Sequence, residues 1–141
     1  MMRLLLAVAA TVAMSAPSVV RADEPPAAVV RQLEAFMVSV RDGKVEQAYA
    51  DLFAGTLMSK KQAEVEQMVA LTAAATRHCG PIRDWQMIKA EEFTPAVYNV
   101  VYLIRSEGCP FFFQTVNYDN GAKWSVNYVN FTDVYLTAKD W

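Results

Sequence analysis

The stretch TRHCGPI, residues 76–82, divides the sequence into two halves of different periodicity. Before it, apolar residues recur about every 3.6 positions, which is typical of helices with one buried face. After it, apolar and polar residues alternate, as they do in strands. Gly80 and Pro81 are residue types that end helices. Because the helical half precedes the strand half, the sequence predicts an α+β fold.

The helical half predicts three helices. Their apolar stripes run over residues 29–40, 45–52 and 65–72. Gly43 suits a left-handed cap at the end of the first helix. Ser59 and Gln62 have the spacing of a capping box, which predicts Ser59 as the N-cap of the third helix. That helix is expected to run to about Thr76.

The second half predicts four strands. They are expected at residues 82–91, 96–106, 111–118 and 123–134. Asn120-Gly121 is a strong hairpin signal between the last two. Short turns between consecutive strands predict an antiparallel meander, and sheet twist curls such a sheet around the helices. We therefore expect three helices packed on a curved, cone-shaped sheet with a pocket at its open end.

Length and composition exclude several classes of protein. The 141 residues fit one domain and are too few for a TIM barrel, which needs roughly 250 residues. A formal charge of −2 argues against nucleic acid as a partner. One His and two Cys argue against a His/Cys zinc site. No metal and no other cofactor is expected.

Residues 1–22 have the three regions of a secretory signal peptide in order. Arg3 gives a positive start, an apolar run follows from Leu4 to Met14, and Ala22 precedes the expected cut before Asp23. The alternative is an uncleaved anchor, but the apolar stretch of residues 4–20 is short for a span of about 20 residues. We predict a mature domain of residues 23–141, periplasmic or secreted, without a stable membrane anchor.

Cys79 and Cys109 are the two cysteines of the chain. Export would place them in a compartment that permits disulfides. They precede the first and third predicted strands, which start at the same end of a meander. We predict a structural disulfide between them; two free thiols and a redox-active pair are the alternatives, and no C-x-x-C motif supports the latter.

Three segments together resemble the nuclear transport factor 2-like superfamily, whose members are also called ketosteroid isomerase-like or cystatin-like. They are Val38–Tyr49, the third helix running from Ser59 into Gly80-Pro81, and the closing hairpin 119–126. The resemblance covers about Ala27–Asp133 and implies a secreted bacterial member. The superfamily contains isomerases, dehydratases and ligand binders, and its members commonly form homodimers through the sheet.

The catalytic candidates are weak. Proton transfer in isomerase-like relatives uses Asp or Glu, and Asp84 in the first strand could act as a base if it were buried against aromatic residues. Tyr98 or Tyr102 would then donate a hydrogen bond. The alternative for Asp84 is a solvated charge on an edge strand. His78 follows the pattern of a residue that interacts with the last carbonyls of a helix.

Amides interrupt the predicted strands. Asn99, Gln114 and Asn127 lie in otherwise apolar segments, where Asn is disfavoured. A ligand pocket would explain them, because binding cavities are apolar with a few oriented polar groups. Trp124, one of the aromatic residues that cluster in the sheet, joins them as a ligand-binding candidate. A solvent-facing sheet surface is the alternative explanation.

Both faces of the predicted strand 96–106 are apolar. An antiparallel sheet with one face in water should show one polar face. The outer face is therefore expected to be covered by a second copy of the chain or by another partner.

Two functions from different classes follow. The first is an exported binding or interaction module without catalytic activity, which takes a small hydrophobic ligand or a protein partner. The alternative is a small isomerase or lyase that acts on a hydrophobic ligand in the cone.

Overall fold

The computed structural model describes residues 24–134, 138, 140 and 141. The predicted signal peptide lies outside the described residues, so cleavage and export stay predictions. Within the described part, no helix combines the length and apolarity needed to cross a membrane. The elements in chain order are α1 (Ala27–Arg41), α2 (Val45–Leu52), a 3₁₀ helix η1 (Leu57–Lys60), α3 (Gln62–Cys79), β1 (Ile82–Thr94), β2 (Val97–Ser106), β3 (Pro110–Asp119) and β4 (Trp124–Thr132).

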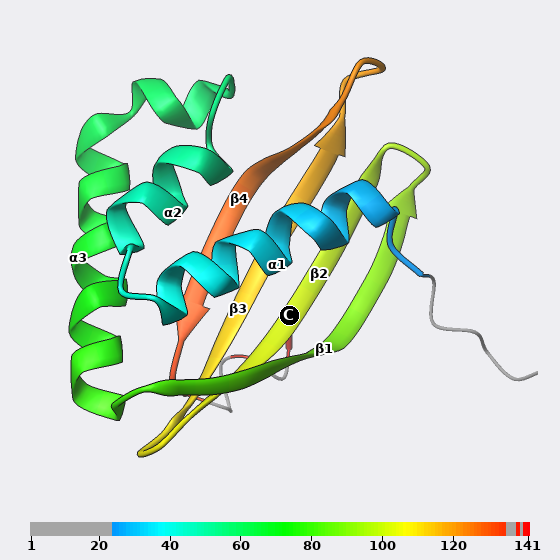
Figure 1. The fold of residues 1–141 in the computed structure, drawn as a ribbon. Helices are drawn as coiled ribbons and strands as arrows, with labels where there is room; N and C mark the ends of the chain where they lie inside the picture. Colours follow the sequence, from blue (N-terminus) through cyan, green and yellow to red (C-terminus); the bar gives the residue numbers. More distant parts are fainter. Residues whose placement is uncertain (1–23, 135–137, 139) are drawn as a thin grey trace, which may run out of the picture.

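The four strands form one antiparallel sheet in the order β1-β2-β3-β4, and α1 crosses one of its faces (Figure 1). The register of β1 against β2 shifts at several points, and that of β3 against β4 shifts between Val116 and Asn117. Such bulges bend strands and increase their twist. The α+β fold of three helices followed by a four-stranded meander is confirmed.

The core lies between α1, α2 and the face of the sheet that α1 covers, which we call the inner face. Apolar residues three and four apart on α1 bury one stripe of the helix. Phe36 from this stripe stacks on Phe113 of β3 with the ring centroids 4.8 Å apart, and Tyr49 of α2 meets Phe36 edge-on at 5.0 Å. Aromatic side chains therefore fill the centre of the cone.

The predicted capping box is wrong. Ser59 lies inside η1, where its hydroxyl donates to the main-chain oxygen of Thr56 at 2.7 Å. Ser hydroxyls often hydrogen-bond to nearby main-chain groups in this way, and this local bond competes with capping of the following helix. α3 begins at Gln62 after Lys61, which makes no side-chain cap.

Some element ends also differ from the prediction. α3 continues past Thr76 to Cys79 and ends at Gly80, whose φ of 77° is the left-handed conformation that glycine tolerates. β1 continues to Thr94, because it pairs with β2 until the turn at Pro95 and Ala96. β4 ends at Thr132, two residues before the predicted end.

Candidate functional site

A cavity of about 330 Å³ opens between α3 and β4. Most of its lining is apolar: Met68, Leu71 and Ala75 come from α3, and Phe111, Val129 and Phe131 from the sheet. The carboxylate in the lining belongs to Asp133, which is exposed. The volume and the apolar walls are typical of a small-molecule site. We call it the α3–β4 cavity.

Two buried hydroxyls belong to the polar part of this lining, which also includes Asn130, Thr132 and Asp133. Tyr49 of α2 and Thr72 of α3 are both 1% exposed, and their hydroxyl oxygens lie 2.9 Å apart. The pair carries two donor hydrogens, and the bond between them uses one. The remaining hydroxyl hydrogen can be donated to an acceptor on a ligand. The sequence had placed Thr72 only in an apolar stripe, so its pairing with Tyr49 was missed.

Tyr102 lies in the core. The side chain is 2% exposed, and no hydrogen bond to its oxygen is formed by the described residues. Burial, with a smaller contribution from the negative charge of Glu34, raises the pKa of Tyr102 to about 12. Burial likewise raises the pKa of Tyr49 to about 12, although the Thr72 hydrogen bond opposes the rise.

Removal of the hydroxyl is expected to change the free energy of unfolding in opposite directions at these two tyrosines. Tyr102→Phe removes an unsatisfied buried group and should raise the free energy of unfolding by up to about 1 kcal/mol, whereas Tyr49→Phe breaks a buried hydrogen bond and should lower it by about 1 kcal/mol. Urea unfolding at pH 7 measures both. If both variants changed the free energy of unfolding by the same amount in the same direction, the contrast between a hydrogen-bonded Tyr49 hydroxyl and an unsatisfied Tyr102 hydroxyl would be contradicted.

The pH dependence follows from the same shifts. The unfolded chain ionises its tyrosines near pH 10, while the folded chain keeps Tyr49 and Tyr102 protonated until about pH 12. The unfolded state therefore binds fewer protons in this window, and stability falls as pH rises from 10 to 12. In either Phe variant the free energy of unfolding should fall less between pH 10 and pH 12, because one of the two shifted groups is absent.

Asp84 lies on the face of the sheet opposite α1, which we call the outer face. It pairs in register with Arg105 of β2, whose Nη2 donates to Oδ2 at 2.8 Å, and both side chains are exposed. This hydrogen bond raises the pKa of Arg105. Since Tyr98 and Tyr102 belong to the core on the inner face, the structure does not bring Asp84 to either tyrosine.

Tyr98 instead meets Glu92. Its hydroxyl donates to Glu92 Oε2 at 2.6 Å across the β1–β2 hairpin. Trp124 packs edge-on against the Tyr98 ring, with the centroids 5.8 Å apart. Glu92 is exposed. The sequence did not predict this pair, although the hairpin register would have placed the two residues opposite each other.

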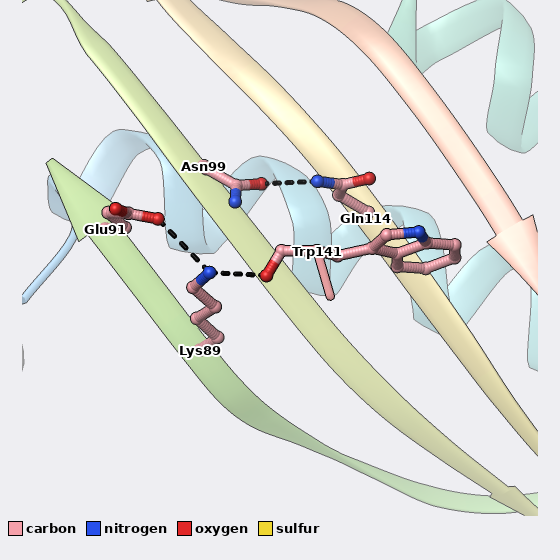
Figure 2. A network of polar contacts seen from close by, with 5 residues as sticks. All are labelled: Lys89, Glu91, Asn99, Gln114 and Trp141. Carbon is pink, nitrogen blue, oxygen red and sulfur yellow. Dashed lines mark hydrogen bonds and ion pairs between the residues drawn. The ribbon is translucent and has the colours of Figure 1, made fainter. Parts of the chain in front are cut away.

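Asn99 and Gln114 lie side by side on the outer face, where the Gln114 amide donates to Asn99 Oδ1 at 3.0 Å (Figure 2). Trp141 lies over the same part of the sheet, and its main-chain oxygen accepts a hydrogen bond from Lys89 Nζ (Figure 2). Lys89 also pairs with Glu91 at 3.2 Å. One hydrogen bond thus joins the two amides beside Trp141.

The predicted ligand-binding residues therefore do not form one site. Asn99 and Gln114 share the outer face, Trp124 packs at the end of the sheet against Tyr98, and Asn127 is exposed on β4. None of the four belongs to the lining of the α3–β4 cavity.

The outer face is covered in part by the chain itself. Val101 is 2% and Phe112 7% exposed, although both point away from the core on the inner face. Trp141 lies across this face (Figure 2). The sequence had left only a second copy or another partner as the cover. The homodimer through this face stays a prediction.

The disulfide between Cys79 and Cys109 is present, with the Cα atoms 5.1 Å apart. It joins the end of α3 to the start of β3, and the Gly108 amide donates to the Cys79 oxygen at 2.7 Å beside it. His78 is exposed in the last turn of α3. Among the described residues, no group of His, Cys, Asp or Glu is arranged to hold a metal ion.

No family model and no curated protein matches the chain. A solved structure is similar in fold: a Campylobacter jejuni protein with the provisional name NTF2-like transpeptidase. The two share 15% sequence identity with a TM-score of 0.53, and the match covers 70% of this chain and 95% of the other. This likeness concerns the fold and agrees with the resemblance that the sequence suggested.

Proposed function

We propose that this chain, which has the NTF2-like fold, is an exported module without catalytic activity that binds a small apolar ligand in the α3–β4 cavity. The observation that carries the proposal is the Tyr49–Thr72 hydroxyl pair, which is buried beside the apolar walls of the cavity. The ligand would bear a hydrogen-bond acceptor, such as a ketone or ester carbonyl, and export rests on the sequence of residues 1–22.

The apolar walls would supply most of the affinity. Burial of ligand surface against Met68, Phe111 and Phe131 is favourable by about 25 cal/mol per Å². The hydroxyl pair would orient the ligand, since a buried donor without an acceptor is costly. Ligand sites commonly combine apolar walls with a few polar groups that fix the orientation of the ligand.

The positions of the carboxylates support the non-catalytic reading. A base that abstracts a proton from a ligand must lie within hydrogen-bond reach of it. Asp84, the base that the sequence suggested, is on the outer face in an ion pair with Arg105 and outside the lining of the cavity. Asp133 is in the lining, but it is exposed to solvent rather than enclosed with the ligand.

One observation favours the alternative, an isomerase or lyase. The Tyr98–Glu92 hydrogen bond pairs a carboxylate with a donor hydroxyl. However, Tyr98 is in register with Asn117 of β3, whereas Phe131 of the cavity is in register with Phe113. The pair therefore lies further along the sheet than the cavity and would need a separate ligand site.

Nile red, an uncharged apolar dye with a ring carbonyl, tests the proposal. We expect its emission to rise and shift to the blue with oxidised protein of residues 23–141. Ala75→Phe fills the cavity and should weaken binding at least about tenfold, which is a loss of about 1.4 kcal/mol. The double variant Tyr49→Phe/Thr72→Val removes both hydroxyls and should weaken binding about fivefold, because a single remaining hydroxyl could still donate its hydrogen to the ligand.

Ala70→Phe is the matched control, because Ala70 is on the same helix but outside the α3–β4 cavity. It should leave the dissociation constant unchanged. Absence of dye binding, or equal effects of Ala70→Phe and Ala75→Phe, would overturn the proposed site.

A further inference from the structure

A second cavity, of about 570 Å³, lies between α2 and α3, and we call it the α2–α3 groove. Its floor is apolar and includes Phe53, Val65 and Val69. Tyr49 contributes to both cavities, but the α3 residues that line them are different. The groove is large enough for a drug-sized molecule.

The charged residues that line the groove have one sign. Glu46 comes from α2 and Glu66 from α3, so the two walls each contribute a carboxylate. The other polar lining residues, Ser59 and Gln62, are uncharged. Within the described part of the chain, neither glutamate takes part in an ion pair.

We propose that the α2–α3 groove binds a cationic amphiphile, meaning a small molecule with an apolar body and an amine or quaternary ammonium group. The apolar body would cover Phe53, Val65 and Val69, and the cation would lie near Glu46 and Glu66. The two carboxylates would attract a cation in the groove even in partly solvated surroundings, and they would repel an anionic head group. The proposal is independent of the ligand in the α3–β4 cavity.

Isothermal titration with three probes tests this inference, each used below its micellar concentration. Decyltrimethylammonium carries both parts of the proposed ligand, decyl sulfate reverses the charge, and tetramethylammonium keeps the charge without the apolar body. We expect decyltrimethylammonium to bind at least fivefold more tightly than decyl sulfate. Tetramethylammonium should bind at least tenfold more weakly than decyltrimethylammonium.

Charge variants separate the groove from the general negative charge of the protein. Glu46→Gln and Glu66→Gln should each weaken decyltrimethylammonium binding about two- to fivefold, the range of exposed ion pairs. Glu64→Gln removes the same charge from the same helix outside the groove, so it should leave binding unchanged.

Filling variants locate the site. Ala70→Phe should weaken decyltrimethylammonium binding at least tenfold, whereas Ala75→Phe, in the other cavity, should not. Equal affinity for the cationic and anionic probes would overturn the inference. So would equal effects of Glu64→Gln and Glu66→Gln, or a loss of binding caused by Ala75→Phe and not by Ala70→Phe. The outcome of these titrations does not depend on whether Nile red binds in the α3–β4 cavity.

Discussion

Replacing Cys79 and Cys109 together with alanine is expected to lower the free energy of unfolding by about 3.5–4 kcal/mol. The bridge closes a loop with a sequence separation of 30, and the chain-entropy account assigns this much to the restriction of an unfolded chain of that length. Because the loop contains β1 and β2, its release frees more than half of the strand-forming sequence in the unfolded state. Urea unfolding of the oxidised protein and the double variant measures the difference.

Reduction of the wild-type disulfide supplies the control. It should lower stability by a similar amount, because it removes the same constraint without removing the sulfur atoms. A loss of less than 1 kcal/mol in both measurements would contradict a structural role for the bridge and favour one of the other roles that the sequence left open.

Phe113→Ala is expected to lower the free energy of unfolding by about 3–5 kcal/mol. Phe113 is fully buried, stacks on Phe36 of α1 and also meets Phe131 of β4 at 6.5 Å. Its removal would leave a cavity where the helices meet the sheet, and a well-packed core closes such a space only in part. Chemical denaturation measures the loss.

A double-mutant cycle with Phe36→Ala tests the contact itself. The coupling between the two rings should be about 0.5–1.5 kcal/mol. Phe93→Ala is the control, since Phe93 is 80% exposed near the β1–β2 turn and should change stability by at most about 0.5 kcal/mol. A cycle without coupling would contradict the packing of α1 on β3.

The fold could be predicted because its signals are local. The change of period at residues 76–82, the glycine stops and the Asn-Gly turn each act over a few residues, and each corresponds to an element boundary in the structure. Ser59 was misassigned because its hydroxyl can serve either a helix start or the preceding turn, and the structure uses the turn.

The residues of the α3–β4 cavity could not be predicted, since its contacts join distant segments. Tyr49 and Thr72 are 23 residues apart and occur in two apolar stripes that gave no sign of a hydrogen bond. Asn99 and Gln114 were correctly noticed as unusual strand residues, but their cross-strand bond and the position of Trp141 depend on the tertiary structure. The apolar outer face was recognised, whereas its partial cover by Trp141 was not.

α3 forms a wall of both cavities, and the disulfide fixes its end to the sheet. Ala70 and Ala75 lie on this one helix but line different cavities, so Phe substitutions at the two positions test the two sites separately. It also predicts that a ligand in the α3–β4 cavity should contact α3 and β4 together.

The position of Nile red on the protein, mapped by ¹H–¹⁵N spectra of residues 23–141, is the most direct test of the proposed ligand site. We expect the largest amide shifts at residues 68–75 of α3 and 129–132 of β4, with loss of those shifts in Ala75→Phe. Shifts confined to the outer face around Asn99 and Gln114, or to the Tyr98–Glu92 end of the sheet, would contradict a binding site in the α3–β4 cavity.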